Sequence, residues 1–242
     1  MMEDGSNLYR VAQQYIAPVV KRYARLEVVG AQHLPEPSQG ALLACNHSGS
    51  FWWDALCLIT ALSDRRIHFI AHHWDAKIPL LKKPLDMIEC SFLDECEDHI
   101  DEHCEVVNGL LAGKQMCIYP EESYHSFRHR YTLFKFSSHV ARYAQKANVP
   151  IVPVNVIGAE EAAPTLIGMK KAKVPLHVPF HLPIILPLKI TIDIGLPIQP
   201  QELELVDNPE EMLRQRMYST ISKYRKCKLS DDKYIDKSSW LF

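Results

Sequence analysis

A histidine and an aspartate early in the chain have the side chains of a proton-transferring pair. His47 and Asp54 have six residues between them. An imidazole accepts a proton near neutral pH, and a carboxylate on its other ring nitrogen fixes the tautomer and stabilises the imidazolium. The two residues therefore predict a general base and its partner. Taken alone, a structural histidine with satisfied hydrogen bonds explains the same two residues.

No serine nucleophile motif accompanies this pair. The sequence contains no G-x-S-x-G element, which would place a serine on a sharp turn between a strand and a helix. We therefore expect an acceptor hydroxyl to attack a thioester carbonyl directly while His47 removes its proton. General-base catalysis of this kind contributes about 10²–10⁴-fold to a rate.

Short apolar strands alternate with helical patterns along the chain. This alternation predicts an α/β fold, with a mixed, largely parallel sheet flanked by helices and with functional residues at strand ends. We expect one domain over residues 1–242, because no repeat or linker interrupts the pattern. The predicted strands are 26–29, 41–45, 67–71, 115–119, 151–157 and 189–194, and the predicted helices are about 54–63, 95–112, 132–148 and 209–226.

Two apolar segments lie outside this alternation. Residues 1–24 predict an amphipathic helix that Pro18 should kink or break. Residues 174–198 carry a proline at every fourth position from Pro175 to Pro187, which predicts extended chain. The helix docks on the domain or contacts a membrane surface. The proline-rich segment covers the core, lines an acyl-chain pocket or dips into a membrane.

Composition restricts the location and the partners. The net charge of −2 gives no general case for nucleic acid binding, which usually needs a basic stripe. Seven cysteines without a repeated C-x-x-C pair indicate reduced thiols. The sequence shows neither a secretory signal nor an apolar run of about 18 residues. We expect a cytoplasmic protein attached peripherally to a membrane.

Three sequence blocks carry a family resemblance. Asn46 and His47, with an aspartate on the next predicted helix, resemble the first motif of the glycerophospholipid (lysophosphatidate-type) acyltransferase superfamily. Residues 119–121 resemble its Phe-Pro-Glu-Gly-Thr-Arg block, and residues 149–154 resemble its Pro-Ile-Val-Pro-Val strand. The spacing of six residues and the Gly-Ala-Glu-Glu run at 158–161 resemble one branch of the superfamily.

The resemblance implies an O-acyltransferase. Its donor would be acyl-CoA or acyl-carrier protein, its acceptor a lysophospholipid or glycerolipid-like hydroxyl, and no acyl-enzyme would form. No metal and no cofactor beyond the donor substrate are expected. His47 and Asp54 would be catalytic. The residues that would bind substrate are Asn46, Ser48, Gly49, Pro120, Glu121, Glu122, Ser123, Arg128 and Arg130.

Departures from the family pattern affect the acceptor. Glu122 and Ser123 stand where the family block has Gly-Thr, and the arginine that should follow is missing. Arg128 and Arg130 lie just beyond and have the guanidinium geometry that phosphate contact needs. A glutamate at a glycine position repels phosphate unless it is paired, so an acceptor with a neutral head group is also compatible with the sequence.

Three other functions stay open on the sequence. Water as the acceptor would make the protein a thioesterase or lipid hydrolase. The altered blocks would also fit a catalytically inactive lipid-binding protein. Cys96, His99 and His103 have a helical spacing, but they match no standard zinc pattern and sit among acidic residues, which favours a solvated helix.

Overall fold

The computed structural model describes residues 9–10, 12–47, 49, 52–72, 90–93, 104–122, 125–167, 180–181 and 184–231. Its main sheet has seven strands: β1 Glu27–Val29, β2 Ala41–Cys45, β3 Ile67–His72, β4 Ser91–Leu93, β5 Gln115–Ile118, β7 Ile151–Ile157 and β10 Thr191–Ile194.

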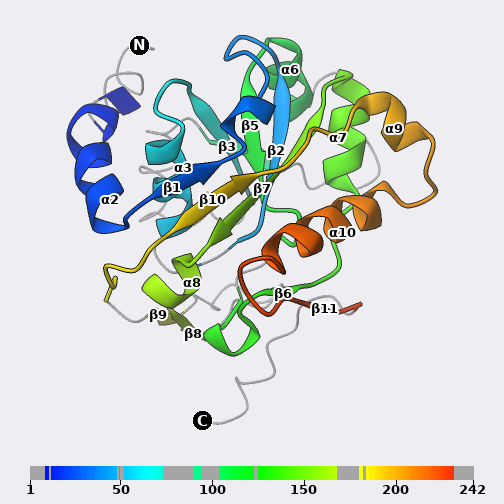
Figure 1. Ribbon diagram of the computed structural model, residues 1–242. Coiled ribbons are helices and arrows are strands. Elements are labelled where there is room, and N and C mark those ends of the chain that lie inside the picture. The colour runs from blue at the N-terminus through cyan, green and yellow to red at the C-terminus, as the bar shows by residue number, and fades with distance from the viewer. Residues whose placement is uncertain are drawn as a thin grey trace.

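The strand order across the sheet is β1-β10-β7-β2-β5-β3-β4 (Figure 1). The run from β7 to β4 is parallel, β10 is antiparallel to β7, and β1 is parallel to β10. The predicted mixed, largely parallel sheet is confirmed. The carboxyl ends of β2, β5 and β7 meet at one edge, which we call the carboxyl edge. It lies toward the bottom of Figure 1.

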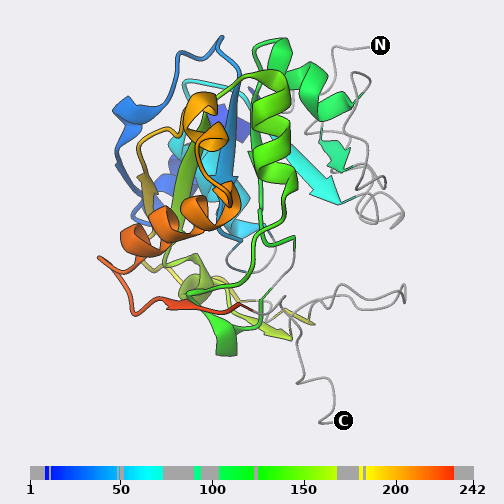
Figure 2. The ribbon, with the colours of Figure 1, turned by 90° about the vertical axis from the view of Figure 1, so that its right-hand side faces the viewer.

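Helices cover both faces of the sheet (Figures 1 and 2). β2 is buried at every position because its alternate side chains face two apolar layers: Leu43 and Cys45 point to one, and Leu42 and Ala44 to the other. The first layer contains α2 Ala17–Tyr23, α3 Trp53–Ala61 and α8 Ala159–Ala162. The second contains α6 Glu105–Leu111, α7 His139–Ala147, α9 Pro200–Glu204 and α10 Pro209–Ile221.

Short pairings complete the carboxyl edge. β6 Thr132–Leu133 pairs in parallel with β11 Lys228–Leu229, and β8 Thr165–Ile167 pairs antiparallel with β9 Phe180–His181. A 3₁₀ turn, η3 Phe127–His129, lies in the same region. β6 and η3 follow β5, and β8 and β9 follow β7, so these pieces add side chains at the carboxyl edge, where His47 follows β2.

The helix predicted over residues 132–148 begins only at His139, so its first turns were predicted wrongly. Thr132 and Leu133 instead form β6, and the carbonyl of Leu133 accepts from Arg214 Nη1 at 3.5 Å and from Ser230 N at 3.0 Å. Partners far along the chain therefore override the local helical period. The helix predicted over 209–226 ends at Ile221. Within the predicted 95–112, the structure describes a helix from Glu105 to Leu111, and residues 95–103 lie outside the described part.

The N-terminal helix restarts where Pro18 was expected to disturb it. A π-helix, η1 Ala12–Ile16, precedes α2, and Pro18 lies in the first turn of α2, where a missing N–H is tolerated. Residues 184–190 form no helix, as predicted, and the Ile190 amide donates to the Ala24 carbonyl at 2.9 Å. Residues 174–179 and 182–183 lie outside the described part. The proline-rich segment and α2 are therefore neighbours.

Candidate active site

A buried asparagine fixes the turn that follows β2. Asn46 Oδ1 accepts from the Val156 amide at 2.7 Å, and its Nδ2 donates to the Val156 carbonyl at 3.0 Å. Val156 belongs to β7, so this side chain imitates one more step of strand pairing beyond the end of β2. Asn46, which the resemblance implied to bind substrate, thus uses both ends of its side-chain amide to join β2 to β7.

The next residue forms the predicted pair. His47 Nδ1 lies 2.7 Å from Asp54 Oδ2, with His47 only 7% exposed and Asp54 fully buried. Asp54 is in the first turn of α3, where a carboxylate is favoured by the helix dipole, and its Oδ1 accepts from the Ala55 amide at 2.8 Å. This contact assigns the proton on Nδ1 and leaves Nε2 as the nitrogen that can accept one.

An aromatic side chain that the sequence did not single out completes this arrangement. The Tyr119 ring is stacked on the His47 imidazole, with centroids 4.2 Å apart and an interplanar angle of 24°. Tyr119 directly follows β5, the neighbour of β2. Its position at the carboxyl end of the strand predicted over 115–119 was the available signal, because residues at the carboxyl ends of adjacent parallel strands meet at one edge.

The residues after Tyr119 form an anchored turn. The side chain of Glu121 is nearly buried, with Oε2 2.6 Å from His125 Nε2 and 3.4 Å from the Phe134 amide. Glu122 has a left-handed backbone with φ +51°, and its Oε1 lies 2.8 Å from His139 Nδ1. Each carboxylate contacts a histidine side chain of the same chain. Glu122 is therefore paired, and a paired glutamate is compatible with a nearby phosphate.

The predicted arginine pair lies at the surface. Arg128 and Arg130 are both exposed, within and just after η3. The Arg130 guanidinium sits over the Phe127 ring at 4.6 Å, and its Nη1 donates to the Phe127 carbonyl at 3.3 Å. Pro120 is buried in the turn, and its carbonyl accepts from the Ser137 amide at 2.8 Å. Ser48 and Ser123 lie outside the described residues.

The Gly-Ala-Glu-Glu run at residues 158–161 packs against Gly49, in the turn between β2 and α3. Gly49 has φ +89°, and a Cβ at this position would stand 2.9 Å from the Ala159 carbonyl oxygen, so only glycine allows this approach. Tyr131 anchors α8 through three hydrogen bonds. Its hydroxyl donates to Glu161 and accepts from the Gly158 amide at 2.9 Å, and its own amide donates to Glu160 at 3.0 Å.

Glu160 itself is buried beside other carboxylates. Burial raises its pKa well above the ordinary value, and although the Tyr131 amide lowers the pKa, the charges of Glu161 and Glu121 raise it further. Folding therefore favours the protonated form of Glu160. A neutral carboxyl at this position limits the repulsion among the three carboxylates behind the site.

The three residues considered above for a zinc site are not part of the described structure. Cys96, His99 and His103 lie outside the described residues. Within the described ranges, no group of His, Cys, Asp and Glu side chains could hold a metal ion. Within the same ranges no disulfide forms among the cysteines, which lie at positions 45, 57, 90, 104, 117 and 227.

The family model for Acyltransferase matches residues 25–157, more than half of the chain. The chain belongs to this acyltransferase family. The matched region begins just before β1 and ends with β7, and it includes His47, Asp54 and Tyr119. The family predicted from the resemblance is thereby confirmed.

Individual relatives extend this picture. The chain is 27% identical over 155 residues to the uncharacterized proteins Mb0514 of Mycobacterium bovis and Rv0502 of Mycobacterium tuberculosis, and the match covers 62% of the chain but only 42% of either relative. The crystal structure of the 1-acyl-sn-glycerophosphate acyltransferase PlsC from Thermotoga maritima superposes with a TM-score of 0.58 at 17% identity, covering 93% of this chain and 86% of that one. The acyltransferase fold is therefore shared over most of the domain.

Replacement of Asn46 by alanine should lower the free energy of unfolding by about 1–3 kcal/mol, because two buried backbone groups of Val156 lose their partner. Chemical denaturation measures the change. Asn155→Ala is the matched control, since this equally buried asparagine donates to the Asp193 carbonyl at 3.3 Å. Equal losses in both variants would mean that the bridge to Val156 has no special weight.

Proposed function

We propose that the protein transfers a fatty acyl group from an acyl-CoA or acyl-carrier-protein thioester to a hydroxyl of a lysophospholipid or glycerolipid-like acceptor. The observation that supports this proposal most is the buried contact between His47 and Asp54 at the carboxyl edge, in a chain of the acyltransferase family. Such an edge is where α/β sheets bind their ligands.

The chemistry follows from the two ring nitrogens of His47. Nδ1–H donates to Asp54, so Nε2 takes the proton of the acceptor hydroxyl as its oxygen attacks the thioester carbonyl. Collapse of the tetrahedral intermediate breaks the carbon–sulfur bond, and the imidazolium returns its proton to the leaving thiolate. The products are the acyl ester and the free thiol, and His47 ends in its starting state.

Single-turnover transfer tests this proposal. Acyl-CoA and acyl-carrier-protein donors are paired with lysophospholipid, glycerophosphate and neutral lipid acceptors, and mass spectrometry identifies the products. An acylated lipid from the wild type supports transfer and names the acceptor. Free fatty acid as the sole product, with acceptor present, would make the protein a thioesterase or lipid hydrolase. Lipid binding without turnover of any donor would point to a binding protein.

We propose that Arg128 and Arg130 contact the phosphate of a phosphorylated acceptor. The double variant Arg128→Ala, Arg130→Ala should lower kcat/KM about two- to tenfold for phosphorylated acceptors and leave neutral acceptors unchanged, since exposed ion contacts contribute little each. Lys146→Ala, which removes an exposed cation from α7, is the control. Equal loss on both kinds of acceptor, or no loss at all, argues against the contact.

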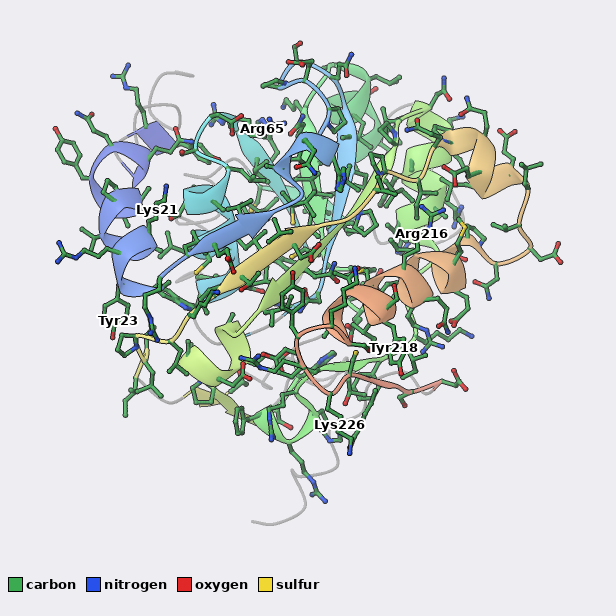
Figure 3. The ribbon with its side chains drawn as sticks, viewed as in Figure 1. Lys21, Tyr23, Arg65, Arg216, Tyr218 and Lys226 are labelled. Carbon is green, nitrogen blue, oxygen red and sulfur yellow. The ribbon has the colours of Figure 1, made fainter. Side chains whose placement is uncertain are left out.

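We also propose that a membrane surface presents the acceptor. α2 and the extended segment lie side by side, because Tyr23 Oη donates to the Ile185 carbonyl at 2.6 Å and Arg25 Nη2 donates to the Pro187 carbonyl at 3.0 Å (Figure 3). Together they expose an apolar surface, which we call the docking patch. Its members are Tyr15, Ile16, Val19, Tyr23, Ile184 and Leu186.

The charges beside the docking patch and its position near the candidate site support contact with a membrane. Lys21, Arg22 and Arg25 are exposed beside the docking patch, as basic residues are in helices that lie on anionic membranes. The patch is also close to the site, since the Tyr23 ring meets Trp53 edge-on at 6.4 Å and Trp53 precedes Asp54. Among the described residues, no helix has the length and apolar character needed to cross a bilayer.

A further inference from the structure

The Tyr119 ring restrains rotation of the His47 imidazole. His47 Nδ1 lies 2.7 Å from Asp54 Oδ2. Rotation of the imidazole about its Cβ–Cγ bond would lengthen this contact and swing Nε2 away from the acceptor. The Tyr119 ring is stacked on the imidazole, with the ring centroids 4.2 Å apart, and blocks this rotation on one face.

The sheet places Tyr119 there. β2 and β5 run parallel, with Ala44 opposite Ile118. Tyr119 is the next residue after Ile118, and His47 is the third residue after Ala44. Both therefore emerge from neighbouring strands at the carboxyl edge, and the stack depends on strand register.

The turn that follows Tyr119 holds this residue in place. The Tyr119 carbonyl accepts from the Glu122 amide at 3.0 Å, which closes the turn. Glu121 and Glu122 then hold this turn through His125 and His139, at 2.6 Å and 2.8 Å. Because the backbone on either side is anchored, the ring cannot easily move away from His47.

We propose that Tyr119 is a positioning residue for acyl transfer. Its ring keeps the imidazole plane in the orientation that directs Nε2 to the acceptor, and its π-face stabilises the imidazolium that forms when His47 takes the proton. This inference rests on the proposed role of His47 as the base. Both effects come from the aromatic ring, and neither requires the Tyr119 hydroxyl.

Three variants separate the ring from the hydroxyl. Tyr119→Leu should lower kcat about tenfold, which corresponds to roughly 1.4 kcal/mol of transition-state stabilisation, with KM nearly unchanged. Tyr119→Phe keeps the ring and should stay within about twofold of the wild type. Tyr218→Leu, on α10 in the opposite layer, is the control for loss of a tyrosine elsewhere in the domain (Figure 3).

The kinetic outcomes decide the proposal. An unchanged kcat in Tyr119→Leu overturns it, and so does an equal loss in Tyr119→Phe, because the hydroxyl would then matter and not the ring. A loss confined to KM would assign Tyr119 to substrate binding and would also contradict positioning. Circular dichroism and a thermal melt confirm that each variant is folded at the assay temperature.

A spectroscopic measurement keeps this inference separate from the proposed function. The ring protons of His47, assigned by their absence in His47→Ala, should be shifted upfield by the Tyr119 ring current. They should move downfield in Tyr119→Leu and stay in Tyr119→Phe. If the wild type transfers no acyl group but the shift is present, the proposed function has failed and the stack stands. If transfer occurs and the shift is absent in the folded protein, the positioning role is wrong.

Discussion

His47→Ala should abolish most acyl transfer, lowering kcat by about 10²–10⁴-fold while KM changes little. The His47 imidazole contacts Asp54 through Nδ1, which directs Nε2 to the proton of the acceptor in the proposed reaction, and it is almost completely buried at the carboxyl edge. Without it, the acceptor hydroxyl has no base. Single-turnover product formation measures the loss directly.

His33→Ala is the matched control for this variant. His33 lies in the short turn after β1, with Nδ1 2.7 Å from the Ile194 carbonyl, and lines a hollow at the opposite edge of the sheet. Its loss should leave transfer unchanged. Retention of wild-type transfer by His47→Ala would remove the base assignment and return His47 to the role of a buried structural histidine.

Asp54→Asn tests whether the carboxylate of Asp54 is needed for catalysis by His47. An amide in place of the carboxylate can hold the ring while favouring the wrong tautomer and no longer stabilising the imidazolium. We expect a loss of the same order as in His47→Ala, and no further loss when the two changes are combined, because the residues act as a unit. Additive losses would mean that Asp54 contributes independently of His47, for example through the first turn of α3.

Val19→Asp combined with Leu186→Asp should prevent flotation with liposomes that contain anionic lipid. Val19 is 66% exposed on α2 and Leu186 is 43% exposed on the adjacent segment, so neither change disturbs the core. Removing an aliphatic side chain from a lipid-buried surface costs about 1.5–3 kcal/mol, and two such changes should weaken binding by more than about a hundredfold.

Leu205→Asp is the control, since Leu205 is 84% exposed and follows α9, away from the docking patch. It should float like the wild type. Point changes are preferable to removal of residues 1–24, because Val20 and Ala24 are buried against the first apolar layer and their loss would unfold it. Unchanged flotation of the double variant would show that membrane contact occurs elsewhere or not at all.

Local patterns were sufficient for the candidate pair and for six strands of the main sheet, but not for β4, β6, β8, β9 or β11. β2 and β7 have the predicted bounds, because both strands are buried at every position and consist mostly of apolar residues. His47 and Asp54 are only seven positions apart, so a strand end, a turn and the first turn of a helix are enough to bring them together.

Contacts between distant residues were decided only by the tertiary structure. Asn46 meets Val156, 110 residues away, and Tyr119 meets His47 only because β2 and β5 are parallel neighbours with a particular register. Residues 132–138 have a helical pattern but form no helix, because β6 pairs with β11. Hydrophobic periodicity reports which face of an element is buried, but it carries no information about which strand lies alongside. The sequence therefore determined the family, most strands of the main sheet and the contact of His47 with Asp54, and the strand order determined the contacts of Asn46 with Val156 and of His47 with Tyr119.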